Sequence, residues 1–171
     1  ESYEDLYEDD ISVFYGVFEA DITPNTLLRV GASDQHNDPG SPTWGALPSW
    51  YSDGSRTDFA RSTTTAADWT RWRTINKNYF ANLIHGFSNG WTLIANYNRL
   101  ENEQKTRLLY LSGTLDEDTG EGLVSYPYRS SGASEQDSVD IQLKGYFDWL
   151  GRKQDFVLGA LYSQQEANTD S

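Results

Sequence analysis

The sequence contains no cysteine or methionine, few basic residues and no long apolar run. The absence of cysteine among 171 residues excludes disulfides, Cys-ligated zinc and thiol chemistry. No stretch provides the ~20 consecutive apolar residues that a transmembrane helix needs, which excludes helical membrane spans. The 13 Lys and Arg residues against 26 Asp and Glu residues give a net charge of -13. This charge argues against nucleic-acid binding, because a phosphate backbone attracts a basic surface.

Aromatic residues are abundant, and the connections between strand-like segments alternate between short and long. Aromatics make up 14% of the chain, which is too many for a disordered polar sequence. Tight turns are predicted at Thr23–Thr26, Ser88–Gly90 and Asp148–Lys153, and long polar segments at Asp34–Thr74 and Asn102–Ser138. An all-β, antiparallel up-and-down meander with short periplasmic turns and long extracellular loops is typical of a large transmembrane β-barrel. We therefore predict this fold class.

Six segments show the apolar–polar alternation of strands, and most are about as long as the ~9–11 residues that a tilted spanning strand requires. The pair Asn89-Gly90 is a strong hairpin signal between two of them. The predicted strands are Ser12–Ile22, Leu27–Ser33, Asn78–Phe87, Trp91–Arg99, Ser138–Lys144 and Asp155–Ser163.

The alternation also assigns side chains to two faces. A charged side chain on the lipid face costs ~2–4 kcal/mol at the membrane midplane, so we expect charged residues to face the barrel lumen. The residues predicted to face lipid are Phe18, Ile22, Leu28, Val30, Leu83, Leu93, Ile141 and Leu143. The residues predicted to face the lumen are Glu19, Arg29, Asn82, Asn96, Asp140 and Gln142.

A soluble β-sandwich would show the same alternation, and it remains the alternative fold. Three features favour the barrel. The long connections exceed the ~12–15 residues that compact domains usually allow. Trp91 and Trp149 lie beside short turns, where a membrane-interface girdle of aromatics is expected. Gly16, Gly31 and Gly159 lie within strands, as curvature or close backbone approach requires.

The long segment Asp34–Thr74 is the strongest candidate for binding, because it combines tryptophan with arginine. It holds four of the six Trp residues and four Arg residues. Exposed rings with interleaved arginines provide flat apolar area and donors for anionic oxygens. The same rings could instead pack the loop against itself, and both interpretations stay open here.

Patterns for catalysis or metal binding are weak. His36 has Asp34 and Asp38 nearby, which is a conceivable metal pair, but a solvated loop is the favoured interpretation. The acidic run 116–121 lacks the glycine and the closing glutamate of an EF-hand, so we interpret it as a charged loop tip. No Gly-rich phosphate loop and no nucleophile elbow is present. We therefore expect no enzymatic activity, no metal site and no covalent cofactor.

A series of motifs follows in order along essentially the whole chain. They are residues 15–28, 31–33, 35–39, 47–48, 51–55, 61–62, 68–69, Trp72, 80–83, 89–91 and 145–152. Together their order and spacing resemble the barrel of TonB-dependent receptors for ferric siderophores, in particular ferric pyoverdine and ferric coprogen receptors.

The resemblance implies a barrel of ~22 strands, closed by a plug domain, in the bacterial outer membrane. Residues 1–171 would be a fragment of the barrel domain of a longer protein, without the plug and the remaining strands. The ligand would be a ferric siderophore, imported with energy from TonB, and the barrel would contact lipid and lipopolysaccharide. By this resemblance Trp44 and Trp72 would face the siderophore, with Arg71 or Arg73 contributing to its anionic oxygens. A general porin and a soluble β-sandwich carbohydrate-binding module are the alternative functions.

Overall fold

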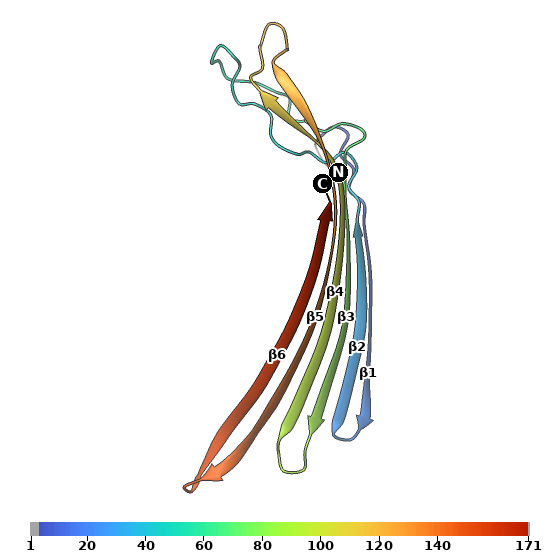
Figure 1. Cartoon of the computed structure of the whole chain (residues 1–171), viewed down its shortest axis with the longest axis vertical. Coiled ribbons are helices and arrows are strands. Elements are labelled where there is room, and N and C mark those ends of the chain that lie inside the picture. Colours follow the sequence, from blue (N-terminus) through green and yellow to red (C-terminus); the bar gives the residue numbers. More distant parts are fainter. Residues whose placement is uncertain (1–3, 171) are drawn as a thin grey trace.

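The computed structural model describes residues 4–170, which form one antiparallel sheet with long loops at one end (Figure 1). The strands are β1 (Ile11–Thr23), β2 (Thr26–Asn37), β3 (Arg71–Gly86), β4 (Thr92–Gly113), β5 (Leu123–Trp149) and β6 (Arg152–Asp170). They lie side by side in chain order, so the predicted all-β meander is confirmed. All six belong to a single open sheet, which contradicts the alternative of a β-sandwich with two facing sheets.

Within residues 4–170, the structure contains no helix of sufficient length and apolar character to cross a membrane.

Short and long connections lie at opposite ends of the sheet (Figure 1). The end that carries the turns after β1, β3 and β5 is called the turn end below, and the opposite end is called the loop end. The loop end carries the connection 38–70 between β2 and β3, and the connection 114–122 between β4 and β5. The prediction that the tight turns share one end of the sheet is confirmed.

The predicted long loop Asn102–Ser138 is wrong, because most of it belongs to two strands. The strand β4 continues to Gly113 and β5 begins at Leu123, which leaves only residues 114–122 as a loop. The polar side chains of this region alternate as a strand requires: Lys105 is exposed, whereas Thr106 is only 5% exposed. Strand pairing also continues beyond the predicted limits in the first loop, which spans 38–70 rather than 34–74.

The strand register divides side chains between the two faces as the sequence predicts. Directly paired residues of an antiparallel ladder share a face, so Asn82 and its neighbours define what we call the inner face. Here Asn82 donates to the Asn96 side chain at 2.5 Å, and Asn96 donates to both oxygens of Asp140 at 3.0 and 2.9 Å. Glu19 and Arg29 form an ion pair in the same row. Seven of the eight residues predicted to face lipid lie on the opposite face, called the outer face. The eighth, Ile22, lies at the register shift between Asp21 and Thr23, where the ladder does not assign it to a face.

Two glycines within strands allow aromatic rings to lie on the backbone. A Cβ at Gly31 would collide with the ring of Phe80 on the inner face. A Cβ at Gly145 would collide with Trp91, which contacts Phe156 at 5.9 Å between ring centroids near the turn end. Close approach of rings therefore explains these glycines, whereas Gly16 has no neighbour closer than 3.8 Å to such a Cβ.

Candidate ligand-binding site at the loop end

The loop 38–70 is anchored at both of its ends beside the first residues of β3. Gly40 forms a bridge with Glu8 and another with Arg71. The backbone N–H of Ser41 donates to the Thr70 carbonyl at 3.1 Å, and the Thr70 hydroxyl donates to the Ala67 carbonyl at 2.7 Å. Thr70 is fully buried, so these polar groups are satisfied within the protein. The anchoring fixes the chain that leads into Trp44.

Trp44 packs on the inner face of the sheet, against side chains from two strands. Its ring centroid lies 5.6 Å from that of Tyr110 on β4 and 5.0 Å from that of Tyr128 on β5. The side chain remains half-buried, which leaves part of the indole accessible. The alternatives of binding and self-packing are therefore not exclusive for this residue, because one side of the ring packs and another is open.

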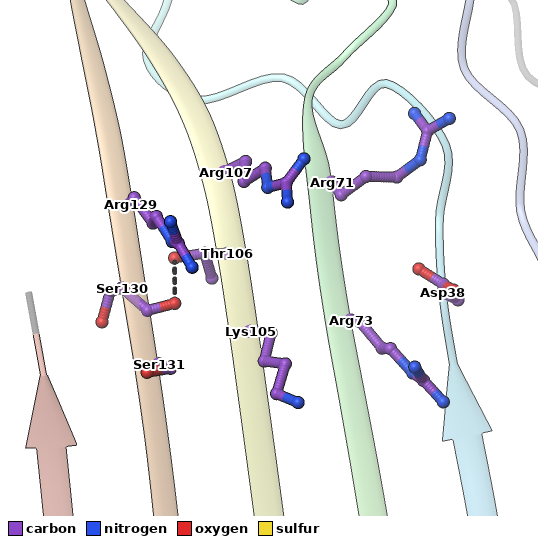
Figure 2. Close-up of a pocket in the computed structure, with 9 residues that line it drawn as sticks. All are labelled: Asp38, Arg71, Arg73, Lys105, Thr106, Arg107, Arg129, Ser130 and Ser131. Atoms are coloured by element: carbon purple, nitrogen blue, oxygen red, sulfur yellow. Dashed lines mark hydrogen bonds between the residues drawn. The ribbon is translucent and has the colours of Figure 1, made fainter.

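Trp72 also lies on the inner face, but the two predicted arginines do not. Trp72 pairs with Thr106 on β4, an inner-face position, and is half-buried. The neighbouring positions Arg71 and Arg73 alternate with Trp72 and therefore project from the outer face. Figure 2 shows both arginines in a groove on the outer face, where the Arg71 guanidinium turns toward the first loop. It donates to the Thr70 carbonyl at 2.7 Å. The structure thus brings Trp44 and Trp72 to one face and separates Arg71 and Arg73 from them.

The two loops of the loop end are joined to each other. Tyr51 forms a bridge with Leu115, and the N–H of Ser52 donates to the Leu115 carbonyl at 2.8 Å. The Ser52 hydroxyl also donates to Asp116 at 3.1 Å. These contacts make loop 114–122 a support for the loop that carries Trp44.

The acidic run 116–121 forms a closed turn. The backbone N–H and the hydroxyl of Thr119 donate to Asp116 at 2.9 and 2.8 Å and hold the pKa of that carboxyl below its usual value. In the other loop, the Ser55 hydroxyl and N–H donate to Asp53 and lower its pKa in the same way. Both carboxylates are thus turn caps, which agrees with the interpretation of a charged loop tip.

The histidine noted in the sequence lies on the outer face of β2. His36 Nε2 is 3.0 Å from an Asp34 carboxylate oxygen. Among residues 4–170, no group of three or more His, Cys, Asp and Glu side chains is placed to hold a metal ion. The pair is therefore a local contact between neighbouring positions of one strand.

Sequence reasoning missed several residues of the loop end. Tyr110 and Tyr128, which support Trp44, lie in the segment that was expected to be a loop. Lys105, Arg107 and Arg129 lie in the same segment and line the groove with Arg71 and Arg73. The alternation of charged with uncharged residues in Lys105-Thr106-Arg107-Leu108 was the available signal for a strand there.

A curved antiparallel meander with its short turns at one end and a polar inner face has the architecture of a segment of an outer-membrane β-barrel. The comparisons with known proteins identify the kind of barrel. The sequence is 37% identical over 160 residues to the ferripyoverdine receptor of Pseudomonas aeruginosa, covering 92% of this chain and 19% of the relative. It is 33% identical over 167 residues to the ferric-pyoverdine BN7/BN8 receptor of Pseudomonas putida, covering 98% of this chain and 20% of the relative.

A solved structure gives the same result for the fold. The crystal structure of the ferripyoverdine receptor of the P. aeruginosa outer membrane, bound to ferripyoverdine, matches with a TM-score of 0.84 and 34% sequence identity. The match covers 98% of this chain and 23% of that chain. No family model matches the sequence. This chain is a homologue of one part of the ferripyoverdine receptors, and it spans about one fifth of the length of the curated relatives it matches.

These relatives confirm the sequence-based recognition of a siderophore receptor barrel and its outer-membrane location. The relatives are receptors and not enzymes, and the matching crystal structure holds ferripyoverdine as its ligand. The binding roles of Trp44, Trp72, Arg71 and Arg73 stay predictions.

Proposed function

We propose that the protein containing this chain is an outer-membrane receptor that binds a ferric siderophore of the pyoverdine class at the loop end and imports it with energy from TonB. The observation that carries the proposal is the position of Trp44 and Trp72. Both lie on the inner face of a sheet whose solved relative, at 34% identity, is a receptor bound to ferripyoverdine.

The two tryptophans would supply flat apolar area to the ligand. Trp44 is held by Tyr110 and Tyr128, so its ring is ordered before binding and little side-chain entropy is lost when the ligand arrives. Trp72 belongs to β3, whose hydrogen bonds to β2 and β4 fix its direction. Arg71 and Arg73 project from the other face, so the direction of these side chains does not support their predicted contribution to the anionic oxygens of the ligand.

The test of function is iron uptake by the whole receptor in cells. A strain that lacks its own pyoverdine receptors is given the full-length protein and supplied with radiolabelled ferric pyoverdine under iron limitation. We expect energy-dependent accumulation of iron that stops when TonB is deleted. Accumulation of iron that is independent of TonB would contradict active import and favour a porin-like channel.

A second siderophore distinguishes selectivity from general permeability. The same cells are offered ferric coprogen and a small sugar that crosses general porins. We expect uptake of ferric pyoverdine in preference to ferric coprogen, and no change in uptake of the sugar. An equal increase in the uptake of both siderophores and the sugar would contradict the receptor hypothesis, because a selective site would not admit the sugar.

A further inference from the structure

A pocket lined by amide side chains lies on the inner face, between Trp72 and the turn end. It encloses about 230 Å³, and its amides come from five adjacent strands: Gln35, Asn76, Asn78, Asn102, Gln136 and Gln165. We call it the amide pocket. Lys77 and Glu101 also border it, but the alternation of their strands directs both side chains to the outer face.

The inner face around the amide pocket carries no charge. Five successive rows of this face run from the pair Trp72–Thr106 to the pair Phe80–Asn98, and no inner-face residue of the described strands in these rows is charged. The next row toward the turn end contains Asp140. Charges at the height of the pocket lie on the outer face, where one row consists of Asp34, Lys77, Glu101 and Glu135.

The amide groups of the pocket are only partly used within the protein. Asn102 donates to the Asn76 side chain at 2.5 Å, and Gln136 donates to the Ser163 hydroxyl at 3.1 Å. Within residues 4–170, the other three side-chain amides with no hydrogen-bond partner are Gln35, Asn78 and Gln165. Because an amide both donates and accepts, the pocket suits a ligand with uncharged amide and hydroxyl groups.

The strength of such contacts suits a site through which a ligand passes. A passage must bind its ligand well enough to admit it and weakly enough to release it. Hydrogen bonds between neutral groups have about half the strength of charge-assisted ones. Asn76 and Asn78 lie four and six residues from Trp72 along β3, which is ~13–20 Å along the strand. A ligand that leaves Trp72 and moves toward the turn end therefore meets a wall of weak contacts.

The inner face of β1 is different and suits a different partner. Val13 and Tyr15 are each 64% exposed and Val17 is 45% exposed, and all three lie on the inner face. Apolar side chains form the core of interfaces between domains, so this strand suits the plug domain that the family resemblance implies. By contrast, Leu100 is the one apolar residue among the described residues that line the amide pocket. The amide pocket therefore fits a small polar ligand better than a packed domain.

We propose that the amide pocket is a second, weaker binding site for the ferric siderophore, occupied while the ligand moves from Trp44 and Trp72 toward the turn end. The pocket holds the uncharged amide and hydroxyl groups of the ligand. This inference deepens the proposed function and rests on it.

The first test captures the ligand during transport. Residues 1–171 contain no cysteine, so a single introduced cysteine has no competitor in this part of the receptor. Asn78→Cys places a thiol in the pocket, and Tyr15→Cys places one at the same height on the inner face of β1. Cells that express the full-length receptor transport ferric pyoverdine carrying a maleimide, and the adduct is measured by mass spectrometry. A small free maleimide corrects for the reactivity of each thiol, and the receptor without the new cysteine gives the background.

A ligand held beside a thiol reacts at a raised effective concentration, so we expect at least about tenfold more adduct at Asn78→Cys than at Tyr15→Cys, and only when TonB is present. Equal capture at the two positions, or more at Tyr15→Cys, would overturn the assignment of this wall. Uptake without capture at Asn78→Cys would also overturn it. An absence of uptake by the parent receptor would instead refute the proposed function.

The second test removes two amides, in the variant Asn78→Leu with Gln165→Leu. Each neutral hydrogen bond contributes about a two- to tenfold change, so the maximal uptake rate should fall about fourfold or more, while the Kd of the loop-end site changes by less than about twofold. The control is Gln154→Leu with Asn168→Leu, two outer-face positions of β6, which should match the parent. Asn78→Gln with Gln165→Asn keeps both amides and should recover most of the rate.

Two results would contradict the inference. A loss of affinity at the loop-end site as large as the loss of rate would mean that the pocket is not a separate site. If the plug packs on these amides, the leucine variant should loosen it and admit a small sugar that the parent excludes. That outcome would assign the amide pocket to the plug.

Discussion

Replacing Trp44 by alanine tests two roles of this ring, which are packing of the loop against the sheet and contact with the siderophore. The indole contacts Tyr110 and Tyr128 at centroid distances of 5.6 and 5.0 Å. Aromatic pairs of this kind contribute about 0.5–1.5 kcal/mol each beyond area burial, so Trp44→Ala should lower the free energy of unfolding by about 1–3 kcal/mol. If the open side of the ring also contacts the siderophore, affinity should fall by about 2 kcal/mol, or roughly thirtyfold.

The assay is a titration of ferric pyoverdine into the full-length receptor, followed by quenching of tryptophan fluorescence and repeated by calorimetry. Trp50→Ala is the matched control, because Trp50 belongs to the same loop and is 60% exposed. We expect weaker binding for Trp44→Ala and for Trp72→Ala, and parent-like affinity for the control.

A different pattern of affinities is expected if Trp44 only stabilises the loop and does not contact the siderophore. Tyr128→Ala removes a packing partner of Trp44 without removing the ring itself. If Trp44→Ala weakens binding no more than Tyr128→Ala does, the ring acts only by supporting the loop. Unchanged affinity in both Trp44→Ala and Trp72→Ala would refute the reasoning that places them at the ligand.

Three other predictions concern the sheet and its loops. Leu150 adopts a left-handed conformation with φ of 52° at the tip of a turn and is 86% exposed, so Leu150→Asn should raise the free energy of unfolding by about 1 kcal/mol, as urea titration in detergent would show. Gly31→Ala should destabilise by about 1–3 kcal/mol because its Cβ meets Phe80, whereas Gly16→Ala should be nearly neutral; equal effects would contradict the packing argument. The pKa of Asp116 is below its usual value of 3.8. The stabilisation that the ionised Asp116 carboxylate gives to the turn is therefore complete above about pH 4–5, and it is lost only as the pH falls through the lowered pKa. The rate of protease cleavage in loop 114–122 should therefore not rise between pH 8 and pH 5.

The sequence by itself determined the strands that cross the sheet and the sharing of side chains between two faces. These features depend on period-2 alternation, which is local and can be read from each segment without knowing its neighbours. Asn89-Gly90 marked a hairpin for the same reason, since the turn geometry depends on a few adjacent residues. The resemblance to siderophore receptors could also be recognised, and relatives at 37% and 33% identity over most of the chain agree with it.

Only the tertiary structure decided how the loop end is built. Lys105 and Arg107 read as loop residues because a strand whose one face is charged and whose other face is covered by a distant loop shows little hydrophobic signal. The packing of Trp44 on Tyr110 and Tyr128 joins residues more than 60 positions apart, and no local pattern encodes such a contact. The placement of Arg71 and Trp72 on opposite faces could be inferred only once the first residue of β3 was known. Because β3 begins at residue 71, its adjacent side chains project to opposite faces, whereas a loop would leave their directions undetermined.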